Sequence, residues 1–483
     1  MALAWCPAAA SAQSYRIRVD ASAQAVAFRG LVRDSIDASL AVPGANGGLQ
    51  TIDGFAVRCG ATGQCQFLRP GAVLHGLPMT TTSSLVLWGL GVEGLAFHAT
   101  ARVVADVGRD QVLPGTVPAG QLLEGYFEYR RAALVARAGR QLVSSRLEPI
   151  GFDGAQLRAH IKQASLDLTG YGGWGLGQAA VLAVTSPALN PLDEWRPRDR
   201  QWVAGAEASL VYKYADIRGE YRREVDPVEH AFVSERAALS ATARIARVRV
   251  VAGADYNLAE GRPGSADLEL TYTRPRYALS GGVRRYQPYF SLWTLWGAFS
   301  PVPYTAANAS AQWQPASWLH VHARGERYQY ANADISTALT PTLEDRGWRA
   351  NTGATATVNT HWTLDGTYSL EHGPGASGRF ADGTITYTPT SAYAFDVYGG
   401  TMARPLELRY YDATSRWIGA RASWQVSTQQ RLWSDVALVN DDRARPDAGA
   451  SSMSQLRVRA GLSLAFGSKA DRIPLPPAHP RGP

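Results

Sequence analysis

Arginine supplies most of the chemistry that this sequence can offer. The 483 residues include 48 lysines and arginines against 41 acids, a formal net charge of +7, and only Lys162, Lys213 and Lys469 are lysines. A guanidinium group binds carboxylate or phosphate through paired hydrogen bonds and stays charged at any working pH. The arginines are spread along the chain at alternate positions. They therefore indicate either a binding path for anionic solutes or a lattice of ion pairs with neighbouring acids.

The candidate path comprises arginines on the polar rows of alternating segments. These are Arg102, Arg130, Arg140, Arg158, Arg218, Arg222, Arg244, Arg249, Arg349 and Arg421. Acids occupy the same rows, among them Asp20, Glu124, Glu128 and Glu207. We therefore keep both interpretations, the electropositive path and the ion-pair lattice. Nucleic-acid binding is not expected, because it needs a basic stripe or a binding motif.

Catalytic and metal-binding patterns are weak in this chain. Of nine histidines, His320 and His322 share a face with Arg324 and Glu326, so a metal pair is conceivable, but pore-lining polar residues explain them more simply. The sequence contains no GxSxG, HExxH, P-loop or dinucleotide motif. We predict no catalytic residues, no metal and no cofactor.

Two cysteines bracket a short turn. Cys59 and Cys65 enclose residues 60–64, and such a pair is usually bridged in an oxidising compartment. Two sulfur ligands are too few for a metal site, so we predict a disulfide.

The elements that must position these residues are strands. Residues 15–28, 95–107 and 455–467 alternate between polar and apolar side chains, as do many further segments of about ten residues. An arginine facing lipid at the bilayer midplane costs about 2–4 kcal/mol. The polar rows should therefore face a water-filled lumen and the apolar rows should face lipid.

The connections support a transmembrane barrel. Tight turns are expected near residues 162–163, 213, 246, 274–275, 314–317, 360, 389–390 and 428–430, and longer loops at 176–200, 287–302, 331–346 and 440–454. Aromatic pairs flank four short turns: Tyr212 and Tyr214, Tyr272 and Tyr277, Trp313 and Trp318, and Tyr387 and Tyr393. Trp and Tyr favour the membrane interface, because a flat apolar ring carries a polar group.

We predict an all-β chain, a single antiparallel barrel of about 18–22 strands formed by residues 13–467. No stretch offers the roughly 20 apolar residues of a membrane helix. Residues 31–82 alternate poorly and are expected to form a long outer loop or a constriction in the lumen. Residues 1–12 end in an A-x-A-like site and are interpreted as an incomplete export signal, and residues 468–483 as a Pro-rich disordered periplasmic tail.

Residues 122–168 resemble the alginate-export family of outer-membrane porins. The similar pieces are Glu124-x-Tyr126, then Gly139-Arg140-Gln141, then Phe152-Asp153-Gly154 opening the next strand. The resemblance covers about a tenth of the chain. It implies a monomeric barrel of about eighteen strands that passes an anionic polysaccharide or a smaller acidic solute, with Arg140 the residue that matches directly. Arg140 could equally pair with Asp153 across the outer loop, which would be a structural role.

The combined prediction is a passive channel in the outer membrane of a Gram-negative bacterium. Its solutes would be small or polymeric and anionic, and its other partners outer-membrane lipids and the barrel-assembly machinery. Two alternatives remain, a scaffold barrel around a partner protein and an outer-membrane hydrolase.

Overall fold

The computed structural model describes residues 14–43, 48–55, 57–61, 63–108, 119–176, 201–225, 232–287, 303–331, 345–373, 378–407, 410–444 and 451–468. The interpretations of residues 1–12 as an export signal and of the C-terminal tail fall outside these ranges, apart from Ser468. Most residues of the long loops expected at 176–200, 287–302 and 331–346 also lie outside the described ranges.

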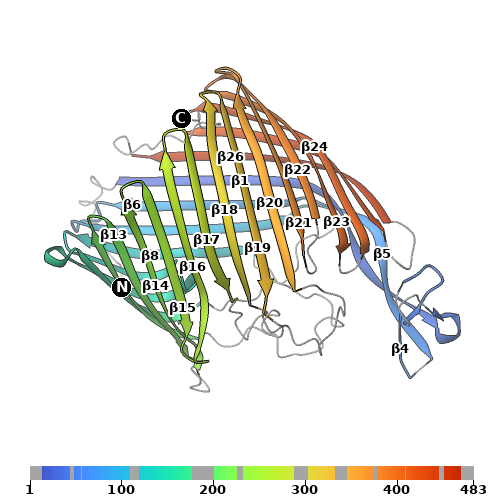
Figure 1. The fold of residues 1–483 in the computed structure, drawn as a ribbon, viewed down its shortest axis with the longest axis horizontal. Coiled ribbons are helices and arrows are strands. Elements are labelled where there is room, and N and C mark those ends of the chain that lie inside the picture. The colour runs from blue at the N-terminus through green and yellow to red at the C-terminus, as the bar shows by residue number, and fades with distance from the viewer. Residues whose placement is uncertain are drawn as a thin grey trace, which may run out of the picture.

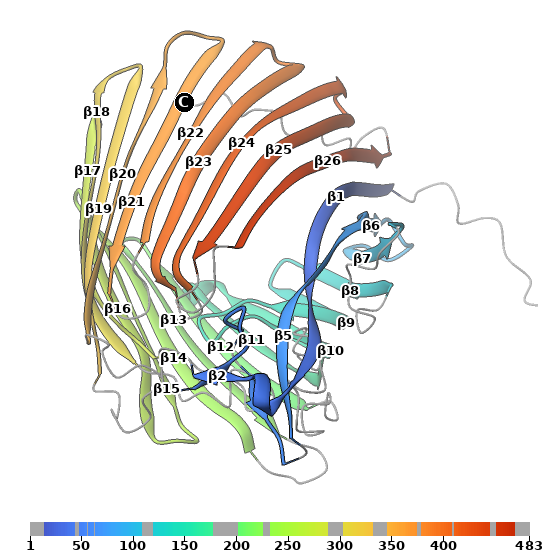
Figure 2. The same ribbon diagram turned by 90° about the vertical axis from the view of Figure 1, so that its right-hand side faces the viewer.

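The chain folds into a closed antiparallel barrel of 22 strands (Figures 1 and 2). Closure occurs at β1 (Ser14–Asp37), whose first half pairs with β6 (Pro78–Trp88) on one side and β26 (Ser451–Gly467) on the other. Every other wall strand pairs with its neighbours in sequence. The prediction of an all-β barrel is confirmed, with four strands more than the eighteen that the resemblance implies.

The remaining wall strands follow in chain order: β7 (Leu95–Asp106), β8 (Gly120–Arg131), β9 (Leu134–Val143), β10 (Ile150–Ile161), β11 (Leu166–Gly175), β12 (Trp202–Tyr212), β13 (Ala215–Val225), β14 (Phe232–Ile245), β15 (Val248–Asn257), β16 (Arg262–Arg274), β17 (Tyr277–Tyr286), β18 (Tyr304–Ala316), β19 (Leu319–Tyr330), β20 (Arg346–Thr357), β21 (Trp362–His372), β22 (Gly378–Thr390), β23 (Tyr393–Glu407), β24 (Tyr410–Ser427) and β25 (Gln430–Ala444). The helices of the described residues are two short 3-10 turns, η2 (Ala38–Leu40) and η3 (Lys162–Ala164). None of these residues forms a helix long and apolar enough to span a membrane.

Burial in this barrel is the reverse of burial in a water-soluble protein. Leu239, Val397 and Ile418 expose 57%, 53% and 60% of their surface, whereas Asp435 and Arg222 expose 1% and 3%. Successive strand side chains point to opposite faces, so the apolar rows lie outside and the charged rows inside. An exposed apolar belt of this kind is stable in contact with the hydrocarbon chains of a lipid bilayer. The expectation that the apolar rows face lipid therefore agrees with the burial pattern.

The connections differ between the two ends of the barrel. All eight tight turns that the sequence predicts occur at one end, where Ser165 and Ala246 take positive φ angles of 49° and 54°. The flanking aromatic rings lie outside, with Tyr212 70% and Trp313 56% exposed. Short turns mark the periplasmic end of outer-membrane barrels. The connection expected at 440–454 is shorter than predicted, because β25 extends to Ala444 and β26 begins at Ser451.

A two-stranded ribbon, residues 26–77, projects from the outer end of the wall. The second half of β1 pairs with β5 (Gln64–Gly76), from Val26 opposite Gly76 to Asp37 opposite Gln64. Figure 1 shows β4 and β5 extending away from the barrel at the lower right. Arg69 binds Asp34 at 2.6 Å and holds the pKa of that carboxyl below its usual value. The wall resumes at Pro78, within the segment whose pattern predicts a loop.

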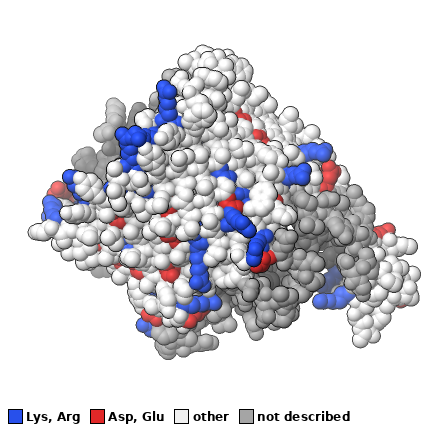
Figure 3. Space-filling view, viewed as in Figure 1, with Lys and Arg blue, Asp and Glu red and all other residues white. Residues whose placement is uncertain are grey.

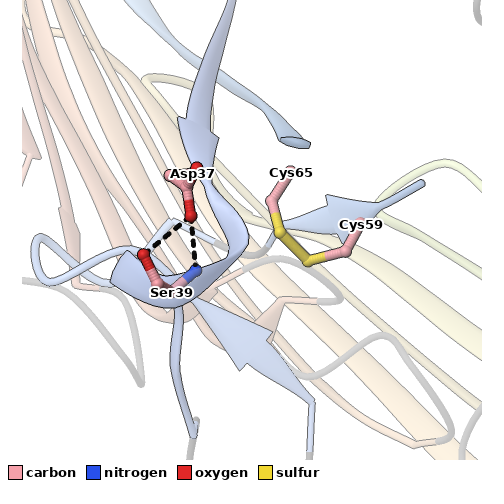
Figure 4. Close-up of a disulfide and its surroundings, with 4 residues drawn as sticks. All are labelled: Asp37, Ser39, Cys59 and Cys65. Atoms are coloured by element: carbon pink, nitrogen blue, oxygen red, sulfur yellow. Dashed lines mark hydrogen bonds between the residues drawn. A yellow bond between two sulfur atoms is a disulfide. The ribbon is translucent and has the colours of Figure 1, made fainter. Parts of the chain in front are cut away.

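The ribbon tip carries the disulfide. Its small elements are η2, β2 (Val42–Pro43), β3 (Leu49–Gln50) and β4 (Arg58–Cys59). Cys59 lies opposite Cys65 in the β4–β5 pairing and is bridged to it, with Cα atoms 3.8 Å apart (Figure 4). Nearby, Asp37 accepts hydrogen bonds from the backbone and hydroxyl of Ser39. The predicted disulfide is confirmed.

Replacing both Cys59 and Cys65 by serine should loosen the ribbon tip and leave the barrel folded. The bridge closes a loop of only six positions and lies outside the wall, so its stabilising effect is local. Limited proteolysis should cut the variant within residues 38–66 faster than the unmodified protein, whereas the folded band on an unheated gel should persist. Loss of that band would contradict the local role.

Candidate functional site

Nine of the ten arginines predicted for the solute path point into the lumen. Each lies on the row opposite the exposed apolar side chains of its strand. In β13, for instance, Arg218 and Arg222 lie on the same row as Glu220, which is 8% exposed, whereas Ile217 on the other row is 41% exposed. The nine are Arg102, Arg130, Arg158, Arg218, Arg222, Arg244, Arg249, Arg349 and Arg421. Most of them bind neighbouring side chains along the wall. Arg102, for example, donates to Gln121 at 2.5 Å.

Arg140 lies on the outer face, so its assignment to the lumen is wrong. It shares its row in β9 with Leu142, which is 49% exposed, whereas Gln141 is 2% exposed and points inward. Arg140 forms a bidentate ion pair with Asp153 at 2.8 and 3.0 Å. The structural interpretation of this pair is therefore the one that the geometry favours.

The glycines of the same motif permit close packing of the strands. Gly139 has φ 129°, and a Cβ atom added there would lie 2.3 Å from the carbonyl oxygen of Gly125. A Cβ atom on Gly154 would lie 2.1 Å from the carbonyl oxygen of Gly172. Phe152 is fully buried on the inner face and packs on Tyr171. The motif thus fixes the β8–β11 wall.

The connection between β9 and β10, residues 144–149, folds back onto the inner wall; we call it the inner loop. Arg222 donates to the backbone oxygens of Leu147 and, at 2.9 Å, Glu148. Arg236 reaches the same Leu147 oxygen at 3.3 Å. The backbone N–H of Arg146 donates to Glu220 at 3.0 Å, and the Arg146 side chain binds Asp267 on β16. The inner loop therefore crosses from β9 to β16 within the lumen.

Apolar packing holds the base of the inner loop. Leu147 is 1% exposed. Val143, Ile150, Phe152 and Val203 form a small core on the inner face, at the point where the loop leaves the wall. Such packing against a rigid wall, together with the arginine contacts, fixes the loop in the lumen instead of above it.

A cavity of about 1130 Å³ lies beside the inner loop on the wall from β8 to β13. Its charged lining includes Arg130, Arg137, Arg158, Arg218, Asp167 and Glu207. Arg130 and Arg158 are 64% and 55% exposed even though they bind Glu128 and Asp167. Each guanidinium has five N–H donors, so donors remain for a solute in this cavity.

On the wall from β17 to β20, three arginines share one carboxylate. Glu326, whose side chain is 2% exposed, accepts a hydrogen bond from Arg284 at 2.8 Å and forms ion pairs with Arg349 at 3.0 Å and Arg324 at 4.0 Å. One negative charge cannot neutralise three positive ones, so this wall is electropositive. Glu371 is nearby and accepts a hydrogen bond from Tyr328 at 3.3 Å, so three arginines on this wall face two carboxylates.

Four tyrosines lie against this group on the inner face. Tyr304 contacts Tyr286, Tyr328 and Tyr330 at ring-centroid distances of 5.2–6.0 Å. Arg284 and Arg349 lie over the Tyr304 and Tyr328 rings at 5.5 and 5.1 Å. The outer part of the lumen thus combines flat rings with guanidinium groups.

Two further lumenal arginines face each other across neighbouring strands. Arg244 and Arg249 are directly opposite in the β14–β15 pairing, near the periplasmic end. In the ranges that the structure describes, neither forms an ion pair. By contrast Asp435, 1% exposed, neutralises part of the wall by binding Arg459 at 3.0 Å and Arg421 at 3.4 Å. The described lumen therefore contains arginines in a lattice of ion pairs as well as arginines that form no ion pair.

The sequence reasoning missed five lumenal arginines of the described residues: Arg137, Arg146, Arg236, Arg284 and Arg431. Alternation could have found Arg236, which follows Ser234 on the row of Ala238. No pattern identifies Arg146, because it lies in the inner loop. His320 and His322, the conceivable metal pair, have ring centroids 6.3 Å apart. Among the described residues no group of three or more potential ligands could hold a metal.

No family model and no curated protein matches this chain. Its fold is similar to solved structures of the ferric enterobactin receptor PfeA from Pseudomonas aeruginosa. One mutant, in complex with enterobactin, is 10% identical with a TM-score of 0.54, covering 93% of this chain and 81% of that chain. A second mutant is 9% identical with a TM-score of 0.52, covering 93% and 80%. The similarity to the alginate-export family stays a prediction. The chain has the fold of an outer-membrane barrel of Gram-negative bacteria. This fold and the exposed apolar belt place the protein in the outer membrane.

Proposed function

We propose that the protein is an outer-membrane channel for passive diffusion of anionic solutes. The observation that carries the proposal is the surplus of guanidinium groups in the lumen at two levels. Near the outer end, three arginines form ion pairs with the carboxylate of Glu326. Near the periplasmic end, Arg244 and Arg249 face each other and form no ion pair in the described ranges.

These two levels suit the stepwise passage of a carboxylate or phosphate. Conduction requires binding that is strong enough for entry and weak enough for exit. Arginines already bound to a wall carboxylate offer only part of their donors, so they should bind a passing anion weakly. The tyrosines beside Arg284 and Arg349 offer flat surfaces to the apolar faces of a larger solute, which supports polymeric as well as small anions.

The variant Arg244→Gln/Arg249→Gln tests the proposal. It removes two charges and keeps hydrogen-bonding groups, so the pore should stay open and the anion preference should fall at low salt. Current steps and reversal potentials in a planar bilayer measure both. The matched control is Arg274→Gln/Arg276→Gln, which removes two charges around a periplasmic turn. An unchanged preference in the lumenal variant would contradict a role for these arginines.

A further inference from the structure

Three arginines lie on the outer surface of the barrel wall near its extracellular end. Arg285, Arg327 and Arg346 are on β17, β19 and β20 and are all exposed. The pairing places Arg327 opposite Ala307 and Arg346 opposite Gln329. They share rows with apolar residues; Arg285, for example, follows Val283, which is 55% exposed.

These arginines border a groove of about 660 Å³, which we call the arginine groove. Its apolar part is lined by Leu268, Val283 and Ala307. Figure 3 shows Lys and Arg side chains gathered over the lower parts of the strands in the middle of the view, on a largely uncharged surface. The basic side chains therefore lie beside an apolar groove near the extracellular end of the wall.

The wall itself neutralises little of this charge. Among the described residues, Arg285 reaches only the Gln287 amide oxygen, at 3.3 Å, and Arg346 approaches the exposed Asp345 at 3.5 Å. Arg327 forms no ion pair within the ranges that the structure describes. An arginine on the lipid-facing row is unfavourable unless a partner or headgroup compensates it.

Two other outward arginines at the same end have carboxylates of their own. Arg140 is paired with Asp153 at 2.8 Å. Arg223 lies directly opposite Glu235 in the β13–β14 pairing. The arginine groove differs from both because, among the described residues, Asp345 is the only carboxylate that approaches its three arginines, and it approaches only Arg346.

We propose that the arginine groove binds a phosphate-bearing lipid of the outer leaflet. The guanidinium groups would donate to the phosphate oxygens, a geometry that arginine fits well. The acyl chains would lie against Leu268, Val283 and Ala307. The site faces lipid and not the lumen, so it is independent of the channel function.

Lipid binding by the variant Arg285→Gln/Arg327→Gln/Arg346→Gln tests this site. The proteins are placed in phosphatidylcholine nanodiscs and titrated with lipid A that carries two phosphates, and bound lipid is counted by native mass spectrometry. The variant should bind about 100-fold more weakly, from about fivefold for each arginine near a charged lipid surface. The control Arg102→Gln/Arg244→Gln/Arg249→Gln removes three lumenal charges and should bind as the unmodified protein does.

Two further arms identify the ligand. Dephosphorylated lipid A should bind the unmodified protein as weakly as lipid A binds the groove variant, and inorganic phosphate at equal concentration should not displace lipid A. Equal binding of lipid A by groove variant and unmodified protein would overturn the proposal, and so would efficient displacement by inorganic phosphate. The groove variant should keep the reversal potential of the unmodified channel, which separates this test from that of the channel function.

Discussion

Releasing the inner loop from the wall should raise the single-channel conductance more than any other substitution in the lumen. In the double variant Arg222→Ala/Arg236→Ala, the Leu147 carbonyl loses both of its side-chain donors. A hydrogen bond from a charged group contributes about 1.5–3 kcal/mol, and Arg222 is 3% exposed. That loss is enough to make a loop withdrawn from the lumen the main state, because 1.4 kcal/mol is already about a tenfold change in equilibrium.

Conductance steps in planar bilayers measure the released loop directly. The control Arg223→Ala changes the neighbouring residue in β13, which points outward, and should keep the original conductance. The folded band on an unheated gel verifies that each variant retains the barrel. If the double variant is folded and conducts as before, the inner loop does not narrow the pore.

Neutralising Glu326 should give the second largest effect, on selectivity and stability together. Glu326→Gln leaves Arg284, Arg324 and Arg349 around a neutral amide, so anion preference should rise at low salt. The barrel should lose about 1–3 kcal/mol, a value below that of a fully buried pair because the arginines are 34–58% exposed.

The variant Glu326→Asp is the matched control, since it shortens the side chain by one methylene and keeps the charge. It should lose stability and keep the original selectivity. Reversal potentials and thermal unfolding in detergent separate the two effects. A Glu326→Gln channel with unchanged selectivity would show that ions do not pass close to this wall.

Alternation was sufficient to predict the fold and most of the lumenal face. Asp396 and Val397 are adjacent and 9% and 53% exposed, as period two requires. The same rule put ten arginines on the polar rows, and nine of them face the lumen in the structure. The rule worked because, in the central part of those strands, charged residues occupy only one face.

Arg140 could not be assigned in this way. Arg137 and Arg140 are three residues apart, so they must point to opposite faces of β9, and nothing local says which of them faces the lumen. The answer depends on Phe152, an apolar residue on the inner face that is buried beside Val143, Ile150 and Val203. The inner loop escaped prediction for a related reason, because its contacts lie on strands some 70 to 120 residues away in sequence.

The reversal potential of the unmodified channel in a salt gradient is the most direct test of the anion path. The Debye length is about 30 Å at 0.01 M and about 3 Å at 1 M, so fixed lumenal charge should act on permeating ions only at low salt. We expect current steps with clear anion preference around 0.01 M, and loss of that preference as the salt approaches 1 M. Cation preference at low salt, or the absence of any current from folded protein, would contradict the proposed function.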